Sequence, residues 1–189
     1  MFRAFGRLAI LPALLAAALM ALPGSAMAGK GKDEGGPVKI KQDDSSKRGG
    51  KKKGGVSTLP IVIAKPGAYQ LVSNIDVTLD PTAVPETDAI QITADNVTLD
   101  LNGFQITGAG ACTGTPVTSC DPVGDPAGGS GVNACDGAGC AVNATVMNGT
   151  VRGMAGAGVR LGDGARVHGV RAGENGEGGI QVGKNSVVA

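Results

Sequence analysis

Three short stretches of this chain resemble one another and recur at a fixed step. They are Asn143-Ala-Thr-Val146, Gly164-Ala-Arg-Val167 and Asn185-Ser-Val-Val188, so the step is 164 − 143 = 21 and again 185 − 164 = 21. A fourth copy, Asn96-Val-Thr-Leu99, begins 47 residues before the first of them, which is one repeat plus 26 further residues. A period of this length is typical of a solenoid, in which each repeat buries its apolar residues by stacking on its neighbours. The repeat therefore constrains the architecture much more than the activity.

Within each copy, apolar and polar residues alternate, as they do in a half-buried β-strand. Val97 and Leu99, for example, flank Thr98. Three short strands per repeat, separated by Gly, Asn and Asp, predict one turn of a three-sided, all-β coil with parallel strands stacked above each other. The expected internal ladders are Leu99–Val146–Val167–Val188; Phe104 and Ile106 with Val151 and then Val170; and Val159–Ile180 with Leu161–Val182, with Ile90 and Ile92 one residue out of step.

Several segments resemble a known family. The runs Ile63-Ala-Lys-Pro-Gly-Ala-Tyr-Gln-Leu71, Asp88-Ala-Ile-Gln-Ile92 and Asp95-Asn-Val-Thr-Leu-Asp-Leu-Asn-Gly-Phe-Gln-Ile-Thr-Gly108 look like the start of a bacterial right-handed parallel β-helix protein. Asn148-Gly-Thr-Val-Arg-Gly153 and Glu174-Asn-Gly-Glu-Gly-Gly-Ile-Gln-Val182 resemble later coils of the pectate-lyase-like superfamily, which includes periplasmic copper-accessory members. The resemblance covers about residues 59–189, except for an insertion at about 109–137, and implies a right-handed parallel β-helix of about five coils. It leaves the activity open, because this superfamily contains lyases, hydrolases, epimerases and adhesins.

The beginning of the chain indicates export. Residues 1–28 have the features of a signal peptide, with Arg3 and Arg7 before an apolar run and Ala26-Met27-Ala28 as a cleavage site. A membrane anchor is the alternative, but the apolar run is short for a bilayer of about 30 Å. We therefore expect a periplasmic, cell-surface or extracellular protein with no transmembrane segment in the mature chain.

The exported chain divides into a basic tail and an acidic body. Residues 29–55 are rich in Gly and Lys and carry a net charge of +5, a composition that predicts disorder. Residues 56–189 carry a net charge of −6 and form the predicted β-helix domain, with an insertion at about 109–137. The tail is expected to attach the protein to anionic polysaccharide or to an envelope surface. Nucleic acid is not an expected partner of an exported chain.

Four cysteines lie in or at the end of the expected insertion. In an exported chain they predict two disulfides rather than a metal site, because their spacing lacks the short CxxC pair of structural zinc sites. Three pairings are open, and the spacing slightly favours joining each cysteine to its nearest neighbour in the sequence. The last of the four falls in register with Leu161 and Val182, so we expect it on a strand. The residues are Cys112, Cys120, Cys135 and Cys140.

Candidates for chemistry are weak. Asp121, Asp125 and Asp136 in the insertion are weak calcium candidates, but their spacing matches no known calcium loop. No cofactor is otherwise expected, and His168 is the single histidine, which disfavours a copper or zinc site.

A modest basic patch is the second candidate site. Arg166, His168 and Arg171 are weak catalytic candidates, since lyases of this superfamily need a base and a cation beside the substrate carboxylate. We expect Arg166 and His168 to point outward around a buried Val167, with Arg152 one coil below. No ladder of aspartates accompanies this patch, so neither a calcium-lyase site nor a pair of glycosidase carboxylates can be assembled from the sequence.

These observations favour a non-catalytic binding or scaffold module at the envelope or outside the cell, directed toward polysaccharide. The alternative is a polysaccharide-active lyase or hydrolase of the same superfamily. Because Asn185-Ser-Val-Val-Ala189 enters a strand and has no capping turn after it, we also expect either further coils beyond the given sequence or end-to-end self-association.

Overall fold

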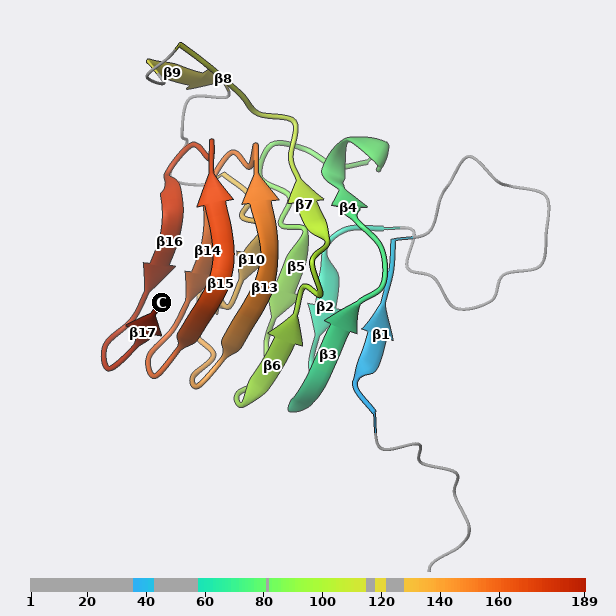
Figure 1. Cartoon of the computed structure of the whole chain (residues 1–189), viewed down its shortest axis with the longest axis vertical. Helices are drawn as coiled ribbons and strands as arrows, with labels where there is room; N and C mark the ends of the chain where they lie inside the picture. Colours follow the sequence, from blue (N-terminus) through green and yellow to red (C-terminus); the bar gives the residue numbers. More distant parts are fainter. Residues whose placement is uncertain (1–35, 43–57, 81, 115–117, 122–127) are drawn as a thin grey trace, which may run out of the picture. The chain divides into compact units, whose positions relative to one another are not determined.

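The regular structure of the described part of the chain consists almost entirely of short β-strands, most of them in parallel pairs (Figure 1). The structure is a computed structural model that describes residues 36–42, 58–80, 82–114, 118–121 and 128–189. It contains no α-helix in these residues and a single turn of 3-10 helix, η2 (Val77–Leu79). The predicted signal peptide, residues 1–28, lies outside the described residues.

Two parallel sheets contain most of the strands, and the chain passes back and forth between them. The first sheet has eight strands in all, with a main path in the order β1-β3-β6-β13-β15-β17 and with β4 and β7 beside it. Its strands are β1 (Val38–Ile40), β3 (Gly67–Leu71), β4 (Ile75–Asp76), β6 (Val97–Asp100), β7 (Gln105–Thr107), β13 (Thr145–Arg152), β15 (Arg166–Gly173) and β17 (Val187–Val188).

The second sheet has five strands in the order β16-β14-β10-β5-β2, and all of its pairs are parallel. Between the two sheets lies a core of aliphatic side chains, as expected for a chain with so few aromatic residues. Its strands are β2 (Ile61–Ile63), β5 (Ile90–Ile92), β10 (Val132–Asn133), β14 (Ala157–Leu161) and β16 (Gly178–Val182).

The first predicted ladder is confirmed. Val146 pairs with Leu99 on one side and with Val167 on the other, and Val167 pairs with Val188. The first three are at most 1% exposed, whereas Val188 in the outermost strand is 52% exposed. The pairs Val159–Ile180 and Leu161–Val182 are also found. Stacking like residues at a constant offset lets each repeat bury its apolar side chains against the next.

The second predicted ladder is partly wrong. Ile106 pairs with Val151 as expected, but the next residue in this ladder is Ala172 rather than Val170. Val170 instead lies opposite Gly149. In the correct register, the spacing from Val146 to Val151 in β13 equals the spacing from Val167 to Ala172 in β15. The prediction chose Val170 instead because its side chain is larger than that of Ala172.

The first sheet bends at one level of the repeat. The bend lies between β6 and β7, where Asn102 has a φ of 53°, and inside β13 and β15, where Asn148 and Gly169 have φ values of 58° and 61°. Asn tolerates this left-handed backbone and Gly adopts it freely, so the sequence places the corner here. Two of the three strands predicted per repeat are thus the two halves of one bent strand in β13 and β15.

The region predicted as one insertion, 109–137, contains a strand of the second sheet. Val132 in β10 is fully buried and pairs with Ile90 and Val159, which brings β5 into step with β14. Two antiparallel hairpins leave the sheets on either side of β10. They are β8 (Ala111–Thr113) with β9 (Ser119–Asp121), and β11 (Cys135–Asp136) with β12 (Gly139–Cys140).

Part of the basic tail is ordered, contrary to the disorder predicted for residues 29–55. Strand β1 pairs with β3, and its Ile40 is 7% exposed. The side chain of Gln42 accepts a hydrogen bond from the Asp76 N–H (2.7 Å) and donates one to the Asp76 carbonyl (2.8 Å). The sequence indicated this strand by the apolar residues Val38 and Ile40 on either side of Lys39. The remainder of the tail, 29–35 and 43–55, lies outside the described residues.

Candidate functional site

The outward face of β13 and β15 carries the predicted basic patch. Arg166 and His168 are exposed on either side of the buried Val167, as the alternation predicts. They lie opposite Thr145 and Met147 of the neighbouring strand. These side chains belong to the first half of the strand, before the bend at Gly169.

Beyond the bend, two arginines line one surface cavity of about 350 Å³. Arg171 lies opposite Thr150, and Arg152 lies opposite Gly173, so the two arginines are diagonal neighbours on the same face. The other lining residues are Gln105, Thr150, Gly173 and Glu174. The structure therefore brings Arg152 and Arg171 together, while Arg166 and His168 do not line this cavity.

Hydrogen bonds between successive strands hold the bend beside this face. The Asn148 side chain donates to the Asp100 carboxylate (3.2 Å), and the same carboxylate oxygen accepts the backbone N–H of Asn102 (2.8 Å). Asn102 in turn donates to the Leu71 carbonyl (3.1 Å). The corner is thus fixed from one strand to the next, which gives the exposed side chains a regular spacing.

A second polar cavity, of about 330 Å³, lies on the outer side of the second sheet. Asp88 accepts hydrogen bonds from the Ser130 N–H (2.7 Å) and from the Asn133 side chain (2.8 Å). Burial raises the pKa of Asp88, and these hydrogen bonds together with the nearby Arg160 oppose the rise. Glu86, Asp136 and Arg160 line the same cavity.

Reasoning from the sequence missed this cavity. Its residues come from segments that lie far apart in the chain, and the pairing of β10 with both β5 and β14 brings three of these segments together. A single Asp before a strand, such as Asp88, has no spacing partner in the sequence that would reveal it. The alignment of β10 between Ile90 and Val159 was the missing information.

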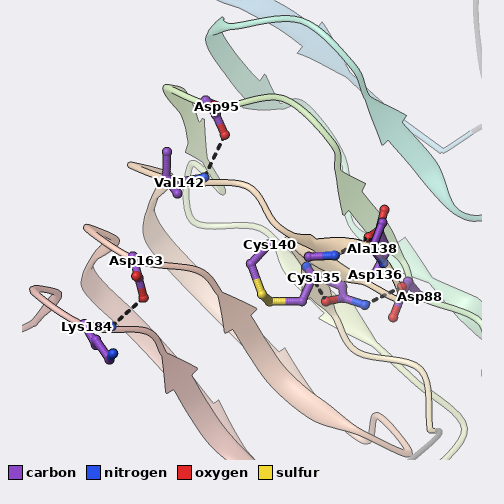
Figure 2. The surroundings of a disulfide bond; sticks show 11 residues. Asp88, Asp95, Cys135, Asp136, Ala138, Cys140, Val142, Asp163 and Lys184 are labelled. Carbon is purple, nitrogen blue, oxygen red and sulfur yellow. Dashed lines mark hydrogen bonds between the residues drawn. A yellow bond between two sulfur atoms is a disulfide. The ribbon is translucent and has the colours of Figure 1, made fainter.

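A disulfide joins the hairpin at the rim of this cavity (Figure 2). Cys135 and Cys140 are bonded, which is the pairing that their spacing favours. The backbone N–H of Cys135 donates to Asn133 (2.9 Å), so the hairpin is tied to the residue that contacts Asp88. Cys140 lies on a strand, as predicted, but this strand is β12 of the hairpin. The predicted register with Leu161 is wrong, because Ala134, whose N–H bonds to the Arg160 carbonyl, occupies that level.

The other cysteine pair is described only by its backbone. Cys112 and Cys120 lie opposite each other in the β8–β9 hairpin. Their side chains lie outside the described residues, so a bond between them stays a prediction.

Of the three calcium candidates, the structure describes the side chain of Asp136. The Asp136 carboxylate accepts the N–H groups of Ala138 (2.8 Å) and Gly139 (3.0 Å) and so stabilises the hairpin turn. Asp125 and the side chain of Asp121 lie outside the described part. Within that part, no three His, Cys, Asp or Glu side chains are grouped in a way that could hold a metal ion.

Aspartates also connect successive repeats along the edge shown in Figure 2. Asp95 accepts the N–H of Val142 (2.8 Å), and Asp163 accepts the N–H of Lys184 (2.7 Å). Both contacts link positions that are equivalent in the repeat. These carboxylates have structural partners, so we do not assign them to a binding site.

A third cavity, of about 300 Å³, lies beside η2 and has mostly apolar walls, among them Val77, Val84 and Met154. In the described residues, no helix is long and apolar enough to cross a membrane. Three kinds of feature therefore remain for a functional interpretation: a basic outer face, a polar cavity beside a disulfide, and an apolar cavity.

The chain matches no known family model, no curated protein and no solved structure.

Proposed function

We propose that residues 59–189 form a right-handed parallel β-helix, a solenoid of about five coils similar to the pectate-lyase-like superfamily. Two observations support this: every strand pair of the two main sheets is parallel, and the chain alternates between the sheets. The sequence offset, which is the same from β13 to β15 as from β15 to β17, also supports it. Strand β1 then extends the first sheet beyond the domain boundary expected from the sequence.

We further propose that the protein is exported and acts as a non-catalytic binding module for anionic polysaccharide at the envelope or outside the cell. The observation that carries this proposal is the outer face of β13 and β15. It presents Arg152, Arg166, His168 and Arg171, although residues 56–189 as a whole carry a net charge of −6. A concentration of positive charge on an acidic body favours a negatively charged ligand at that face.

The shape of this face suits an extended chain. Polar side chains repeat across neighbouring strands, as in the row of Thr98, Thr145 and Arg166. Neighbouring strands lie about 4.8 Å apart, so the row presents polar groups at short, regular intervals. A polymer with repeated acidic groups can contact several such positions at once, and each extra contact raises the overall affinity.

A binding experiment on acidic glycans tests the proposal. The exported protein should bind acidic polysaccharides on an array, and addition of calcium should leave binding unchanged. The double variant Arg166→Gln/His168→Gln should weaken binding at least several-fold, while Arg160→Gln on the other sheet should not. Equal binding by both variants, or the same signal on neutral glycans, would contradict the assignment to this face.

The polar cavity supports a second candidate, a polysaccharide-active enzyme. A carboxyl group with a raised pKa beside further carboxylates is the arrangement that general acid catalysis of glycosidic cleavage requires. Asp88 would be the acid, with Glu86 or Asp136 as the second carboxylate. Release of reducing ends or of unsaturated products from an acidic polysaccharide, abolished by Asp88→Asn, would establish this function. If no such substrate gives products, the enzyme is rejected and the binding module remains the proposed function.

A further inference from the structure

The Arg152–Arg171 cavity has features of a site for a group with a compact negative charge. We propose that it binds a phosphate or sulfate ester, which the bound glycan would carry. The assignment deepens the proposed function and rests on it for the identity of the glycan, whereas the recognition of the ester itself depends only on the cavity.

The strand register places both guanidinium groups on one face. Val151 is fully buried, so its neighbours Thr150 and Arg152 face outward, and the pairing with β15 puts Arg171 and Gly173 beside them. Given a strand spacing of about 4.8 Å and a rise of about 3.3 Å per residue, the Cα atoms of Arg152 and Arg171 are about 8 Å apart. Two long side chains at this distance reach a common anion.

Neither arginine has a hydrogen-bonded or ion-paired partner among the described residues. Glu174 lines the same cavity, yet no described side chain forms a hydrogen bond or ion pair with Arg152 or Arg171. Two adjacent positive charges repel each other, which is unfavourable unless an anion binds between them. The five N–H donors of each guanidinium are therefore available to a ligand.

The composition of the cavity favours a tetrahedral oxyanion over a carboxylate. One arginine satisfies a planar carboxylate by two parallel hydrogen bonds, so a second arginine would be unnecessary. A phosphate or sulfate ester has three terminal oxygens, which match two guanidinium groups and the Thr150 hydroxyl. The Gln105 amide donates one N–H to Thr107 (2.6 Å), which leaves its second N–H as a further donor at the edge of the cavity.

The cavity is also open where a ligand would enter. Gly173 lies opposite Arg152, and a Cβ atom added there would meet no atom within 4 Å. A larger residue at this position would place its side chain beside the guanidinium groups. The long pairing of β13 with β15 provides a rigid base, because the two strands stay in register on both sides of the bend.

Titration of the full exported chain with inorganic phosphate, inorganic sulfate and acetate tests the proposal. We would follow the Nε–Hε signals of the arginines by nuclear magnetic resonance and measure affinity by calorimetry. Phosphate and sulfate should shift Arg152 and Arg171 and bind at least ten-fold more tightly than acetate. Arg152→Gln and Arg171→Gln should each lower phosphate affinity at least ten-fold, and Glu174→Gln should raise it. The control Lys65→Gln, at an exposed position outside the described cavities, should change nothing.

Two further probes identify the source of the ester. Glucose 6-phosphate that binds more tightly than free phosphate indicates a glycan, whereas preferential binding to vesicles containing phosphatidic acid overturns the glycan part. Acetate that binds as tightly as phosphate, or shifts that persist in both arginine variants, overturns the site itself. If the wild-type protein binds phosphate but no acidic glycan, the proposed function is rejected and the oxyanion site still holds.

Discussion

Val146 and Val167 lie directly opposite each other in neighbouring parallel strands, one repeat apart in the chain, and each is at most 1% exposed. Their contact is one level of a ladder that continues from Leu99 to Val188. Each inner member of this ladder is enclosed by the members on its two sides, whereas Val188 in the outermost strand is 52% exposed. The ladder therefore depends on its inner levels being apolar.

The substitution Val146→Asp should unfold the domain. An unpaired carboxylate at a fully buried position costs several kcal/mol, which is comparable to the whole stability of a small domain. Circular dichroism should show loss of the β signal at room temperature. Thr145→Asp, one residue away on the outer face and opposite Arg166, is the matched control and should stay folded. A folded Val146→Asp protein would contradict the described register.

The corner residue Asn143 should tolerate Gly better than Val. Its φ of 57° lies in the left-handed region, where a β-branched residue is strained by about 1–2 kcal/mol. Asn143→Gly removes the strain but loses the hydrogen bond from the Asn143 amide to Asn96 (3.2 Å). Urea unfolding should give the wild type the highest free energy of unfolding, Asn143→Gly a lower one and Asn143→Val the lowest. The reverse order of the two variants would argue against the corner.

Asp80 should make the free energy of unfolding depend on pH in the acidic range. Hydrogen bonds from the Thr82 hydroxyl, the Leu59 N–H and the Thr82 N–H lower its pKa below the ordinary 3.8, while burial opposes them. A lowered pKa stabilises the folded state above the unfolded-state pKa, and this contribution is lost as the pH falls through the folded-state value. Urea unfolding of the wild type and of Asp80→Asn should differ most near neutral pH, and the difference should shrink as the pH falls below 3.8. A difference that is independent of pH would exclude this role.

Breaking the Cys135–Cys140 disulfide should leave the two parallel sheets intact. The bond closes a short loop, with a sequence separation of 5, and constraint of so short a loop contributes about 2 kcal/mol in the chain-entropy description. The double variant Cys135→Ser/Cys140→Ser should lower the free energy of unfolding by at most this amount and keep the far-ultraviolet signal. Loss of that signal would mean that the hairpin supports the sheets. Mass spectrometry of the non-reduced protein should find Cys112 bonded to Cys120, and free thiols there would contradict that pairing.

The basic tail should have two separable roles. Deletion of residues 29–42 should lower the melting temperature, because it exposes the edge of β3 and removes the contacts of Ile40 and Gln42. Replacement of the basic residues of 43–55 by Ser should leave the melting temperature unchanged. It should weaken retention on an anionic polymer at low salt, since exposed charges are screened beyond about 8 Å at physiological salt. Equal retention by the wild type and the Ser variant would refute attachment by the tail.

The period-two pattern of the repeats was sufficient to predict the strands and one complete ladder. Residues such as Leu99 and Val167 recur at equivalent positions of the repeat, and the burial of one apolar face fixes the register of a strand. The same pattern failed at Val170, because side-chain size alone suggested a residue that lies opposite Gly149 instead of Val151. It also failed at Val38 and Ile40, where the surrounding lysines and glycines indicated disorder more strongly than two aliphatic residues indicated a strand.

The candidate sites were harder to predict because they depend on contacts across irregular gaps. Arg166 and His168 could be placed outward from the alternation alone. The cavity around Asp88 needed the position of β10, whose Val132 pairs with Ile90 before it and with Val159 after it. The stretch of chain from Val132 to Val159 is longer than one repeat, so no constant step in the sequence connects Asp88 with Arg160.

The constant offset between β13, β15 and β17 also bears on how a gene for such a chain can change in length. Duplication or deletion in frame of one repeat, for example residues 143–163, returns every following residue to an equivalent level. Each retained valine then meets an apolar partner, and each corner again receives Asn or Gly. A shift of a single residue would instead turn a whole strand inside out. Length variation among natural versions of this protein should therefore occur in whole repeats, or in hairpins such as β11–β12 that leave and rejoin the sheets at one level.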